Sequence, residues 1–257
     1  MSRHDQRVPI TRRGTSVKRR LDQLVVDKGL APSRERARAL ILAGKVLVDG
    51  RPVTKAGTET AENVDVSLAT PDHPYVGRGG VKLAHGLDAF GIRVEGREAL
   101  DIGASTGGFT DALLQRGASR VIALDVGHGQ FDWALRHDPR VVVIEGFNAR
   151  HLTPGDLPGL VDLVVIDVSF ISLRQILPVV PPVLRPGGDV IALVKPQFEA
   201  GRAEVRKGVI RDPAVHVRVV DEVAAAAAGV GLTRLASAAS PITGAKGNQE
   251  FFLHLRA

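Results

Sequence analysis

Short apolar segments of strand length alternate with segments of helical pattern through the later part of the chain. This alternation leaves few folds open, because strands joined by helices run parallel and need a helical layer on each face of their sheet. The predicted strands are residues 98–103, 120–125, 141–145, 163–167, 189–194 and a last strand at 250–255. The predicted helices or partial helices are residues 109–116, 130–136, 173–183 and a longer one from Asp212 and Pro213 to residue 228. The sequence therefore predicts an α/β fold with a mostly parallel sheet.

Positive charge is concentrated in the first part of the chain. Residues 1–75 contain 14 Lys and Arg against 9 Asp and Glu, a net charge of +5, whereas the remaining residues contain 20 against 19, a net charge of +1. The isoelectric point is near 10.0. An excess of positive charge favours binding to a polyanion, and its position indicates that the first part of the chain makes this contact.

This basic region has the pattern of a small α+β domain. Leu21, Leu24 and Val25 recur at helical spacing within residues 18–28. Ser33 is placed to cap a second helix over residues 34–43, with Ala37, Leu40 and Ile41 facing inward. Two short helices are therefore expected in succession.

A β-hairpin is expected after the second helix, because residues 45–53 alternate about the turn pair Asp49-Gly50. Residues 20–60 closely resemble the small RNA-binding domain named after ribosomal small-subunit protein four. The resemblance places such a domain at residues 17–70. Basic side chains that it implies against an RNA backbone are Arg19, Arg20, Arg34, Arg36, Arg38, Lys45, Arg51 and Lys55.

The boundaries follow from composition. Residues 1–16 are polar, basic and without periodicity, which predicts a flexible basic arm. Residues 71–75 contain two prolines and are predicted to be a linker. A second domain is expected over residues 76–257.

Several classes of protein are excluded by composition. The chain has no cysteine, which excludes disulfides, thiolate metal sites and methyl transfer through a cysteine nucleophile. The first residues contain no apolar stretch typical of a signal peptide, and the longest apolar runs have strand length. We therefore expect a cytoplasmic protein. The histidines show no paired metal-ligand spacing, so no metal is expected.

The segment LDIGASTGGF, residues 100–109, places an acid and three glycines between the first strand and a helix. Glycine permits a tight turn there and close approach of a ligand to the backbone. The pattern resembles the first motif of class I methyltransferases, which implies a Rossmann-like fold with a mostly parallel seven-stranded sheet and S-adenosylmethionine as the cofactor. The implied pocket residues in this turn are Asp101, Gly103, Ser105, Gly107 and Gly108.

Two residues after the next strands complete the expected cofactor site. Asp125 ends the second strand, where an acid can accept hydrogen bonds from ribose hydroxyls. Asn148 begins the sequence Asn-Ala-Arg, which resembles the family's segment at the adenine end. The preceding Gly146-Phe147 departs from the polar pair of that pattern.

Four further segments each place one ionisable residue among turn or sheet-end residues. They are GRGGVKL at 77–83, VIDVSF at 165–170, LVKPQF at 193–198 and GAKGNQEFF at 244–252. The order Lys, Asp, Lys, Glu resembles the FtsJ-like ribose 2′-O-methyltransferases. With the N-terminal domain, residues 17–257 resemble the TlyA family of ribosomal RNA 2′-O-methyltransferases, some of which carry the label haemolysin. The implied catalytic residues are Lys82, Asp167, Lys195 and Glu250.

The chemistry explains these residue types. A ribose hydroxyl is a weak nucleophile and a methylsulfonium is already an activated electrophile, so the enzyme must align the two and remove one proton. Burial and a nearby positive charge favour the neutral amine of a lysine. Lys195 is therefore the candidate base or hydroxyl orienter, Lys82 supplies the neighbouring charge, and Asp167 and Glu250 orient the two side chains.

Alternatives to this interpretation stay open. The residues after Asp167 lack the two prolines typical of amino-group methyltransferases, which favours an oxygen target. The family implies cytidine riboses in ribosomal RNA or ribosomal subunits as the substrate. A non-catalytic assembly factor that binds RNA and a membrane-active haemolysin are the other candidates. Arg78 is either an RNA phosphate ligand or a turn residue, and Trp133 is expected in the core. The oligomeric state is not indicated.

Overall fold

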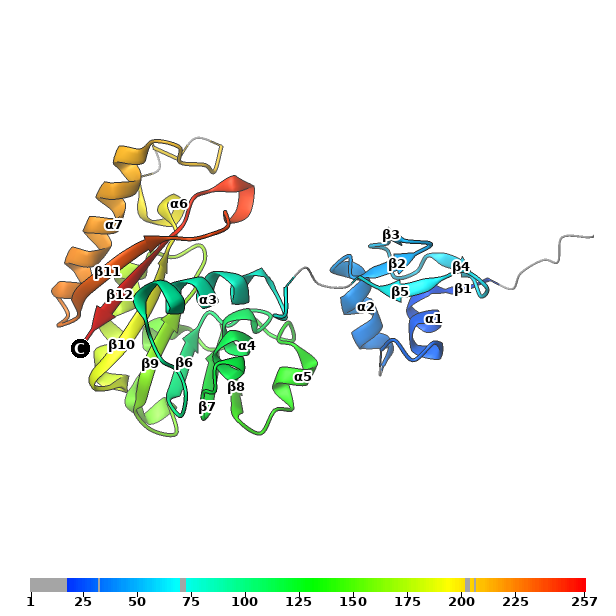
Figure 1. Ribbon diagram of the computed structural model, residues 1–257, viewed down its shortest axis with the longest axis horizontal. Coiled ribbons are helices and arrows are strands. Elements are labelled where there is room, and N and C mark those ends of the chain that lie inside the picture. Colours follow the sequence, from blue (N-terminus) through cyan, green and yellow to red (C-terminus); the bar gives the residue numbers. More distant parts are fainter. Residues whose placement is uncertain (1–17, 32, 70–72, 202–203, 206) are drawn as a thin grey trace, which may run out of the picture. The chain divides into compact units, whose positions relative to one another are not determined.

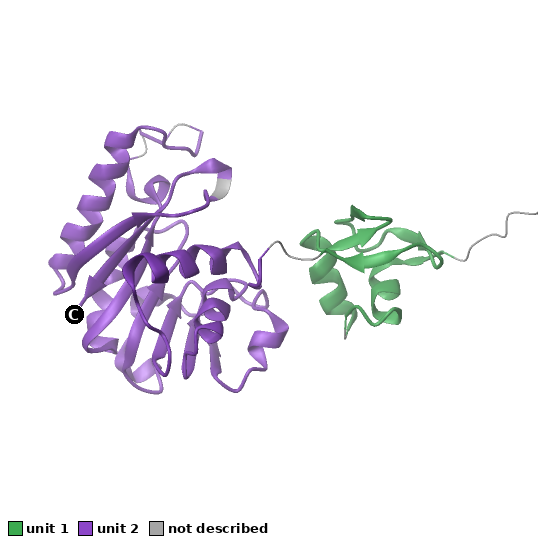
Figure 2. Cartoon of the chain, in the orientation of Figure 1, with its two compact units in different colours: residues 1–72 green, residues 73–257 purple. Residues whose placement is uncertain are grey.

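The computed structural model of the protein describes residues 18–31, 33–69, 73–201, 204–205 and 207–257. The chain separates into two compact units, residues 1–72 and residues 73–257 (Figure 2). The expected basic arm at 1–16 lies outside the described residues, as do residue 70 and residues 71–72 of the expected linker.

The described residues of unit 1 form two helices and two small antiparallel sheets (Figure 1). The helices are α1 (Leu21–Asp27) and α2 (Arg34–Leu42). The strands are β1 (Lys18–Arg20), β2 (Val46–Val48), β3 (Arg51–Pro52), β4 (Glu59–Ala61) and β5 (Val66–Leu68). The first predicted helix is thus shorter than expected, because residues 18–20 pair with β4 as a strand.

The local predictions for unit 1 are otherwise confirmed. Ser33 caps α2 by accepting a hydrogen bond from the backbone N–H of Arg36 at 3.2 Å. Asp49 and Gly50 both have positive φ, 49° and 73°, as the tight turn between β2 and β3 requires. The apolar residues of α1 and α2 that were expected to face inward form the core with Val46 and Val66, except Leu40, which is partly buried and packs against that core.

Unit 2 is built on one sheet of seven strands (Figure 1). These are β6 (Glu98–Ile102), β7 (Arg120–Leu124), β8 (Val141–Ile144), β9 (Val161–Ile166), β10 (Leu184–Val194), β11 (Thr233–Ala239) and β12 (Phe251–Arg256). Their order across the sheet is β11-β12-β10-β9-β6-β7-β8. Among these strands, β12 alone runs opposite to the other six. The predicted mostly parallel, Rossmann-like sheet is confirmed.

Helical segments cover both faces of this sheet. The α-helices are α3 (Arg78–Phe90), α4 (Gly108–Gln115), α5 (Trp133–Arg136), α6 (Pro196–Glu199) and α7 (Pro213–Ala228). Alternate residues of the central strands belong to two separate cores: Val164 and Ile166 pack toward α7, whereas Leu163 and Val165 pack toward α3 and α4. This alternation explains why the central strands are apolar on both sides.

The interpretation of residues 77–83 as a turn is wrong, because they form the first turns of α3. Glycine weakens a helix, so the sequence Arg-Gly-Gly gives little helical signal. Packing requires glycine at position 80, because a Cβ there would overlap Tyr75 at 2.3 Å, whereas a Cβ on Gly79 would meet the ring of Phe109 at 3.4 Å, an ordinary contact distance. Close approach of α3 to its neighbours therefore outweighs helix propensity.

Two other elements differ from expectation. Residues 173–183 form three short 3-10 turns, Leu173–Gln175, Leu177–Val179 and Pro181–Val183, because Pro178, Pro181 and Pro182 interrupt α-helical hydrogen bonding. Strand β11 was not predicted, since it is an edge strand rich in Ala and Ser with mostly exposed side chains. Within the described residues, no helix is both long enough and apolar enough to span a membrane.

Candidate active site

Four strand ends meet at one edge of the sheet of unit 2. Strands β6, β9 and β10 are parallel, so their carboxyl ends lie together, and antiparallel β12 brings its amino end to the same edge. Val194 of β10 pairs with Phe251 of β12. The residues just beyond this pair, Lys195 and Glu250, are therefore placed side by side by the sheet itself.

The four predicted catalytic residues form two ion pairs at this edge. Lys195 Nζ lies 2.6 Å from Asp167 Oδ1 and donates a hydrogen bond to Ser169 Oγ at 2.8 Å. Lys82 Nζ donates to Glu250 Oε2 at 2.6 Å. Both lysines and Glu250 are buried, and Asp167 is half-buried. Each ammonium thus has its own carboxylate, which offsets the cost of burying charge and fixes the side-chain position.

The Lys82 pair is enclosed by α3 and the loop before β12. Gly244 packs so closely on Glu250 that a Cβ there would lie 1.8 Å from Oε1. Arg78, at the first position of α3, donates from Nη2 to the carbonyl of Thr243 in the same loop at 2.9 Å. Arg78 therefore connects α3 to the loop that carries Glu250, and this contact leaves other N–H groups of its guanidinium for an external acceptor.

A cavity of about 500 Å³ opens at the same edge, beside Asp167. It lies where the order of the strands reverses, with β7 on one side of β6 and β9 on the other, which is the usual ligand position in open α/β sheets. Apolar walls come from residues after four strands, and Asp125 and Asn148 contribute polar groups. Its other lining residues include Gly103, Ser105, Gln130, Phe147 and Ser169.

Gly103 has φ of +89° and lies against the neighbouring strand end. A Cβ at this position would lie 2.5 Å from the carbonyl oxygen of Asp167. A side chain is therefore excluded both by the backbone conformation and by space. This glycine lets the turn after β6 approach the Asp167 segment.

Asp125 joins two loops of the cavity wall. Its Oδ2 accepts from the N–H of Ser105 at 2.8 Å, and its Oδ1 accepts from the N–H of Gly127 at 2.7 Å. Asn148 lines the opposite part of the cavity and accepts from the N–H of Arg150 at 3.2 Å. The structure thus brings both predicted polar residues to the cavity.

Three predicted cofactor residues do not line this cavity: Asp101, Gly107 and Gly108. Asp101 is fully buried on the α4 side of β6, where its Oδ2 accepts from Thr110 Oγ1 at 2.7 Å. Gly107 caps α4 with φ of 96° beneath Leu135 and Phe131. Gly108 instead lines a second, smaller cavity of about 130 Å³ that also contains Gly103, Ser105, Asp167 and the first residues of α3.

Phe170 is a site residue that sequence reasoning did not identify. Its side chain is 91% exposed, lines the cavity and lies near Phe198, with ring centroids 5.1 Å apart. Its φ of 65° is unfavourable for a bulky residue. An exposed ring in a strained conformation at a cavity suggests a binding role, and the only sequence signal is an aromatic residue three positions after Asp167.

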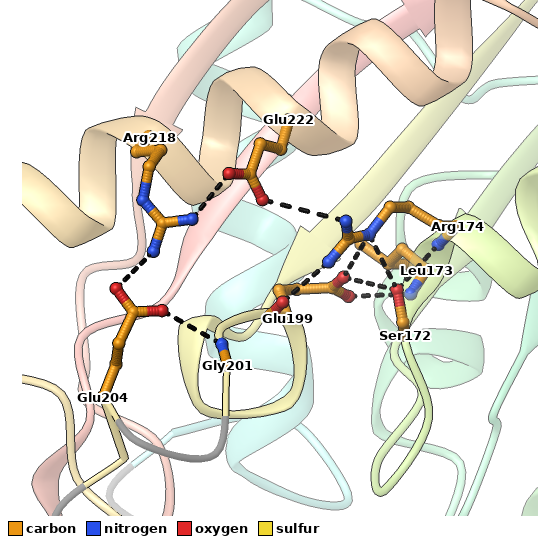
Figure 3. A network of polar contacts seen from close by, with 8 residues as sticks. All are labelled: Ser172, Leu173, Arg174, Glu199, Gly201, Glu204, Arg218 and Glu222. Atoms are coloured by element: carbon orange, nitrogen blue, oxygen red, sulfur yellow. Dashed lines mark hydrogen bonds and ion pairs between the residues drawn. The ribbon is translucent and has the colours of Figure 1, made fainter.

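A polar network holds the two segments that carry Lys195 and Asp167 (Figure 3). Glu199, at the end of α6, accepts from Ser172 Oγ at 2.6 Å and from the N–H of Leu173 at 2.7 Å. Arg174 donates to the carbonyl of Glu199 at 2.7 Å and lies 3.7 Å from Glu222 of α7. Burial raises the pKa of Glu199. Together with the Lys195–Asp167 ion pair, this network fixes the spacing between the segment that carries Lys195 and the segment that carries Asp167.

Trp133 is not a core residue, contrary to expectation. Its side chain is 52% exposed and packs against His137, with ring centroids 4.3 Å apart and the rings tilted by 35°. Helix α5 is only one turn long, so it lies at the surface and covers little of the sheet. Among the described residues, no group of three or more His, Asp or Glu side chains is arranged to hold a metal ion.

The basic residues of unit 1 differ in their surroundings. Arg20 and Arg34 both bind Asp22, and Arg19 binds the two acids Asp27 and Glu62. Arg36 and Lys45 are half-buried. Three further predicted RNA-binding residues have exposed side chains: Arg38, Arg51 and Lys55.

Both units match known families. Residues 75–257 match the model of the FtsJ-like methyltransferases, and residues 19–65 match that of the S4 domain. The chain is 48% identical over 239 residues, 92% of its length and 89% of the relative, to the protein of Mycobacterium tuberculosis strain CDC 1551 named 16S/23S rRNA (cytidine-2′-O)-methyltransferase TlyA. The chain belongs to the TlyA family of FtsJ-like methyltransferases. The resemblance seen in the sequence is confirmed.

Other members of the TlyA family carry a different label. Hemolysin A of Brachyspira hyodysenteriae is 41% identical to this chain, with 91% of the chain and 98% of the relative covered. A solved structure from Streptococcus thermophilus, labelled a candidate hemolysin, has 43% identity and a TM-score of 0.73, and it covers 94% of this chain and 89% of its own. The TlyA fold thus extends over both units of the chain.

Proposed function

We propose that the protein transfers a methyl group from S-adenosylmethionine to the 2′-hydroxyl of a cytidine ribose in ribosomal RNA. The observation that carries this proposal is the buried Lys195, held by Asp167 and Ser169 at the edge of a cavity of about 500 Å³. Family membership supports the reaction type, and the name of the Mycobacterium tuberculosis relative supports the cytidine target. A purely RNA-binding protein has no need for two buried ion pairs beside such a cavity.

The cavity fits the cofactor in size and chemistry. Its volume lies within the range of about 300 to 1,000 Å³ that is usual for small-ligand sites. The apolar side chains of Leu124, Phe147 and Ile171 suit an adenine ring, and Asp125 lies at the end of β7, where it can accept hydrogen bonds from ribose hydroxyls. Asp101 does not line the cavity. It supports the glycine turn after β6 and makes no direct contact with a ligand.

The cofactor, when bound, supplies the activated methyl group, and the residues of this chain align the acceptor hydroxyl. Lys195 Nζ holds or accepts the proton of the 2′-hydroxyl, while Asp167 and Ser169 keep the nitrogen in place. Lys82 and Glu250 form the neighbouring ion pair. The Lys82 ammonium supplies the positive charge of this pair, and the pair helps to enclose the site. Enclosure excludes water and strengthens these electrostatic interactions.

Phe170 is assigned to the target base. Because RNA-modifying sites read unstacked bases by stacking them on aromatic rings, the exposed ring at the cavity mouth offers a platform for the flipped cytosine. We expect Phe170→Ala to lower kcat/KM for ribosomal RNA by about 10- to 100-fold, the value of one base stack. Phe170→Tyr serves as the matched control and keeps most activity. Equal activity of the alanine variant would remove this assignment.

Unit 1 is assigned to RNA binding. Its S4-domain match and the basic side chains on α2 and the hairpin support contacts to the phosphate backbone. Backbone contacts of this kind recruit the RNA. The candidate active site at the sheet edge of unit 2 then selects the hydroxyl that is methylated.

The proposed reaction is tested by mapping ribose methylation. Purified protein is incubated with S-adenosylmethionine and ribosomal RNA or ribosomal subunits that lack the modification, and the RNA is then hydrolysed in alkali. A methylated 2′-oxygen cannot attack the adjacent phosphate, so the expected result is a protected bond 3′ of a cytidine. Methylation of a base, or no methylation on any ribosomal substrate, would contradict the proposal.

A further inference from the structure

Asp22 is a fully buried carboxylate in the first turn of α1, and both of its oxygens are held by arginines. Arg20, at the end of β1, donates from Nε to Oδ1 at 3.1 Å and from Nη2 to Oδ2 at 3.0 Å. Arg34, at the start of α2, donates from Nη2 to Oδ2 at 3.1 Å. One carboxylate therefore brings together two guanidinium groups from separate elements.

The two arginines keep their outer faces toward solvent. Their side chains are 50% and 53% exposed, whereas the carboxylate between them is inaccessible. A guanidinium carries five N–H donors, of which these contacts use two on Arg20 and one on Arg34. Among the described residues, most donors of the pair are thus left for an external acceptor, and the three groups together carry a net charge of +1.

The arrangement is fixed before any ligand arrives. The Arg20 guanidinium holds the pKa of Asp22 down to about 2, so the carboxylate stays charged at neutral pH. The loop at Gly57 packs on Arg20, since a Cβ there would lie 3.3 Å from Nη1. A free arginine loses about 2 kcal/mol of rotamer entropy when it is immobilised, and a side chain that is already held loses less on binding.

We propose that Asp22 positions Arg20 and Arg34 as a preformed clamp for one phosphate group of an RNA backbone. The planar fork of each guanidinium matches the geometry of phosphate oxygens. Asp22 acts through the arginines and touches no RNA, so it is a positioning residue. The inference rests on the proposed RNA-binding role of unit 1 and assigns a specific site within it.

The neighbouring residue pair offers a matched control. Asp27, also on α1, accepts from Arg19 Nη1 at 3.0 Å, but it is partly exposed and Arg19 binds Glu62 as well. Asp22→Asn and Asp27→Asn therefore remove the same charge from the same helix, and only the first releases the clamp. Simple Coulomb attraction predicts tighter RNA binding for both variants, whereas positioning predicts weaker binding for Asp22→Asn alone.

The test measures binding of the full-length chain to fluorescein-labelled ribosomal RNA by anisotropy at several salt concentrations. We expect Asp22→Asn to raise Kd about five- to tenfold and to reduce the salt slope by about one, as for the loss of one phosphate contact. Asp27→Asn is expected to bind as tightly as the unmodified protein or more tightly. Binding by Asp22→Asn that is unchanged or tighter, with an unchanged salt slope, would overturn the proposal.

A second variant keeps the test decisive if Asp22→Asn fails to fold. Arg34→Lys keeps the charge at a half-exposed position but loses the fork, and it is expected to weaken binding to a similar extent. Full affinity of Arg34→Lys would overturn the clamp. Failure of the unmodified protein to bind ribosomal RNA would instead contradict the proposed role of unit 1, so the two failures are distinguishable.

Discussion

Substitution of Lys195 by alanine is expected to abolish methyl transfer, with a fall in the single-turnover rate of at least about a thousandfold. The Nζ atom lies between Asp167 Oδ1 at 2.6 Å and Ser169 Oγ at 2.8 Å, so its position relative to the cavity is fixed. Lys82 cannot take its place, because Lys82 is held by Glu250, which does not line the cavity, whereas the partners of Lys195 do. Transfer of a labelled methyl group to ribosomal RNA measures the effect.

The same variant is expected to keep its fold, its affinity for S-adenosylmethionine and its affinity for RNA. Asp167 remains without its partner, but it is only half-buried and can be hydrated. Lys28→Ala is the charge-matched control, since Lys28 is an exposed lysine of unit 1 that donates to the carbonyl of Val64. If Lys195→Ala turned over as fast as this control, the role assigned to Lys195 would be wrong.

Much of unit 2 is predictable from the sequence, because its central strands are buried on both faces. An apolar run of strand length, such as residues 120–125, strongly favours a buried parallel strand when glycine turns and helical segments flank it. The glycine turn after β6 and the acid at the end of β7 also follow from local pattern. Elements with two exposed faces carry no such signal, and β11 was missed for this reason.

Helix α3 shows a different limit of sequence reasoning. Its first turn contains Gly79 and Gly80, which local propensity assigns to a turn. Gly80 is required because a Cβ there would overlap Tyr75, a contact that exists only in the folded chain. Tertiary packing decides the structure here, and a single sequence does not report it.

The four ionisable residues at this edge of the sheet were predictable as a group, but their pairing was not. The sequence placed two lysines and two acids in one region without indicating that Lys82 binds Glu250 and Lys195 binds Asp167. The pairing depends on β12 being antiparallel, which carries Glu250 to the edge where the parallel strands end. The exposure of Phe170 depends in the same way on a positive φ that its own side chain disfavours.

The free energy of unfolding of unit 2 is expected to depend on pH, and Asp101→Asn is expected to remove most of that dependence. Burial raises the pKa of Asp101 to about 7, and the charges of Asp167 and Asp125 add to the effect. One oxygen accepts from Thr110, and the other is buried without a hydrogen-bond partner among the described residues. The unfolded carboxyl has a pKa near 3.9. Between these values the folded state holds the proton more tightly than the unfolded state.

The sign of the effect follows from proton linkage. Because the folded state binds more protons, the free energy of unfolding falls as pH rises from about 4, and the fall is complete once pH exceeds the folded pKa near 7. At 1.36 kcal/mol per pKa unit, the total is on the order of 4 kcal/mol. Asparagine cannot ionise and still accepts the hydrogen bond from Thr110, so the variant lacks this contribution to the pH dependence.

Urea unfolding of the cofactor-free protein from pH 5 to pH 8.5 measures this difference. The chain has one tryptophan, Trp133, so its fluorescence reports on unit 2 alone. Asp22, whose pKa is lowered to about 2, lies in unit 1 and changes stability only below this range. We expect the stability of Asp101→Asn relative to the unmodified protein to increase steadily toward pH 8. Parallel pH profiles for the two proteins would mean that Asp101 is ionised in the fold, and that a buried donor satisfies its second oxygen.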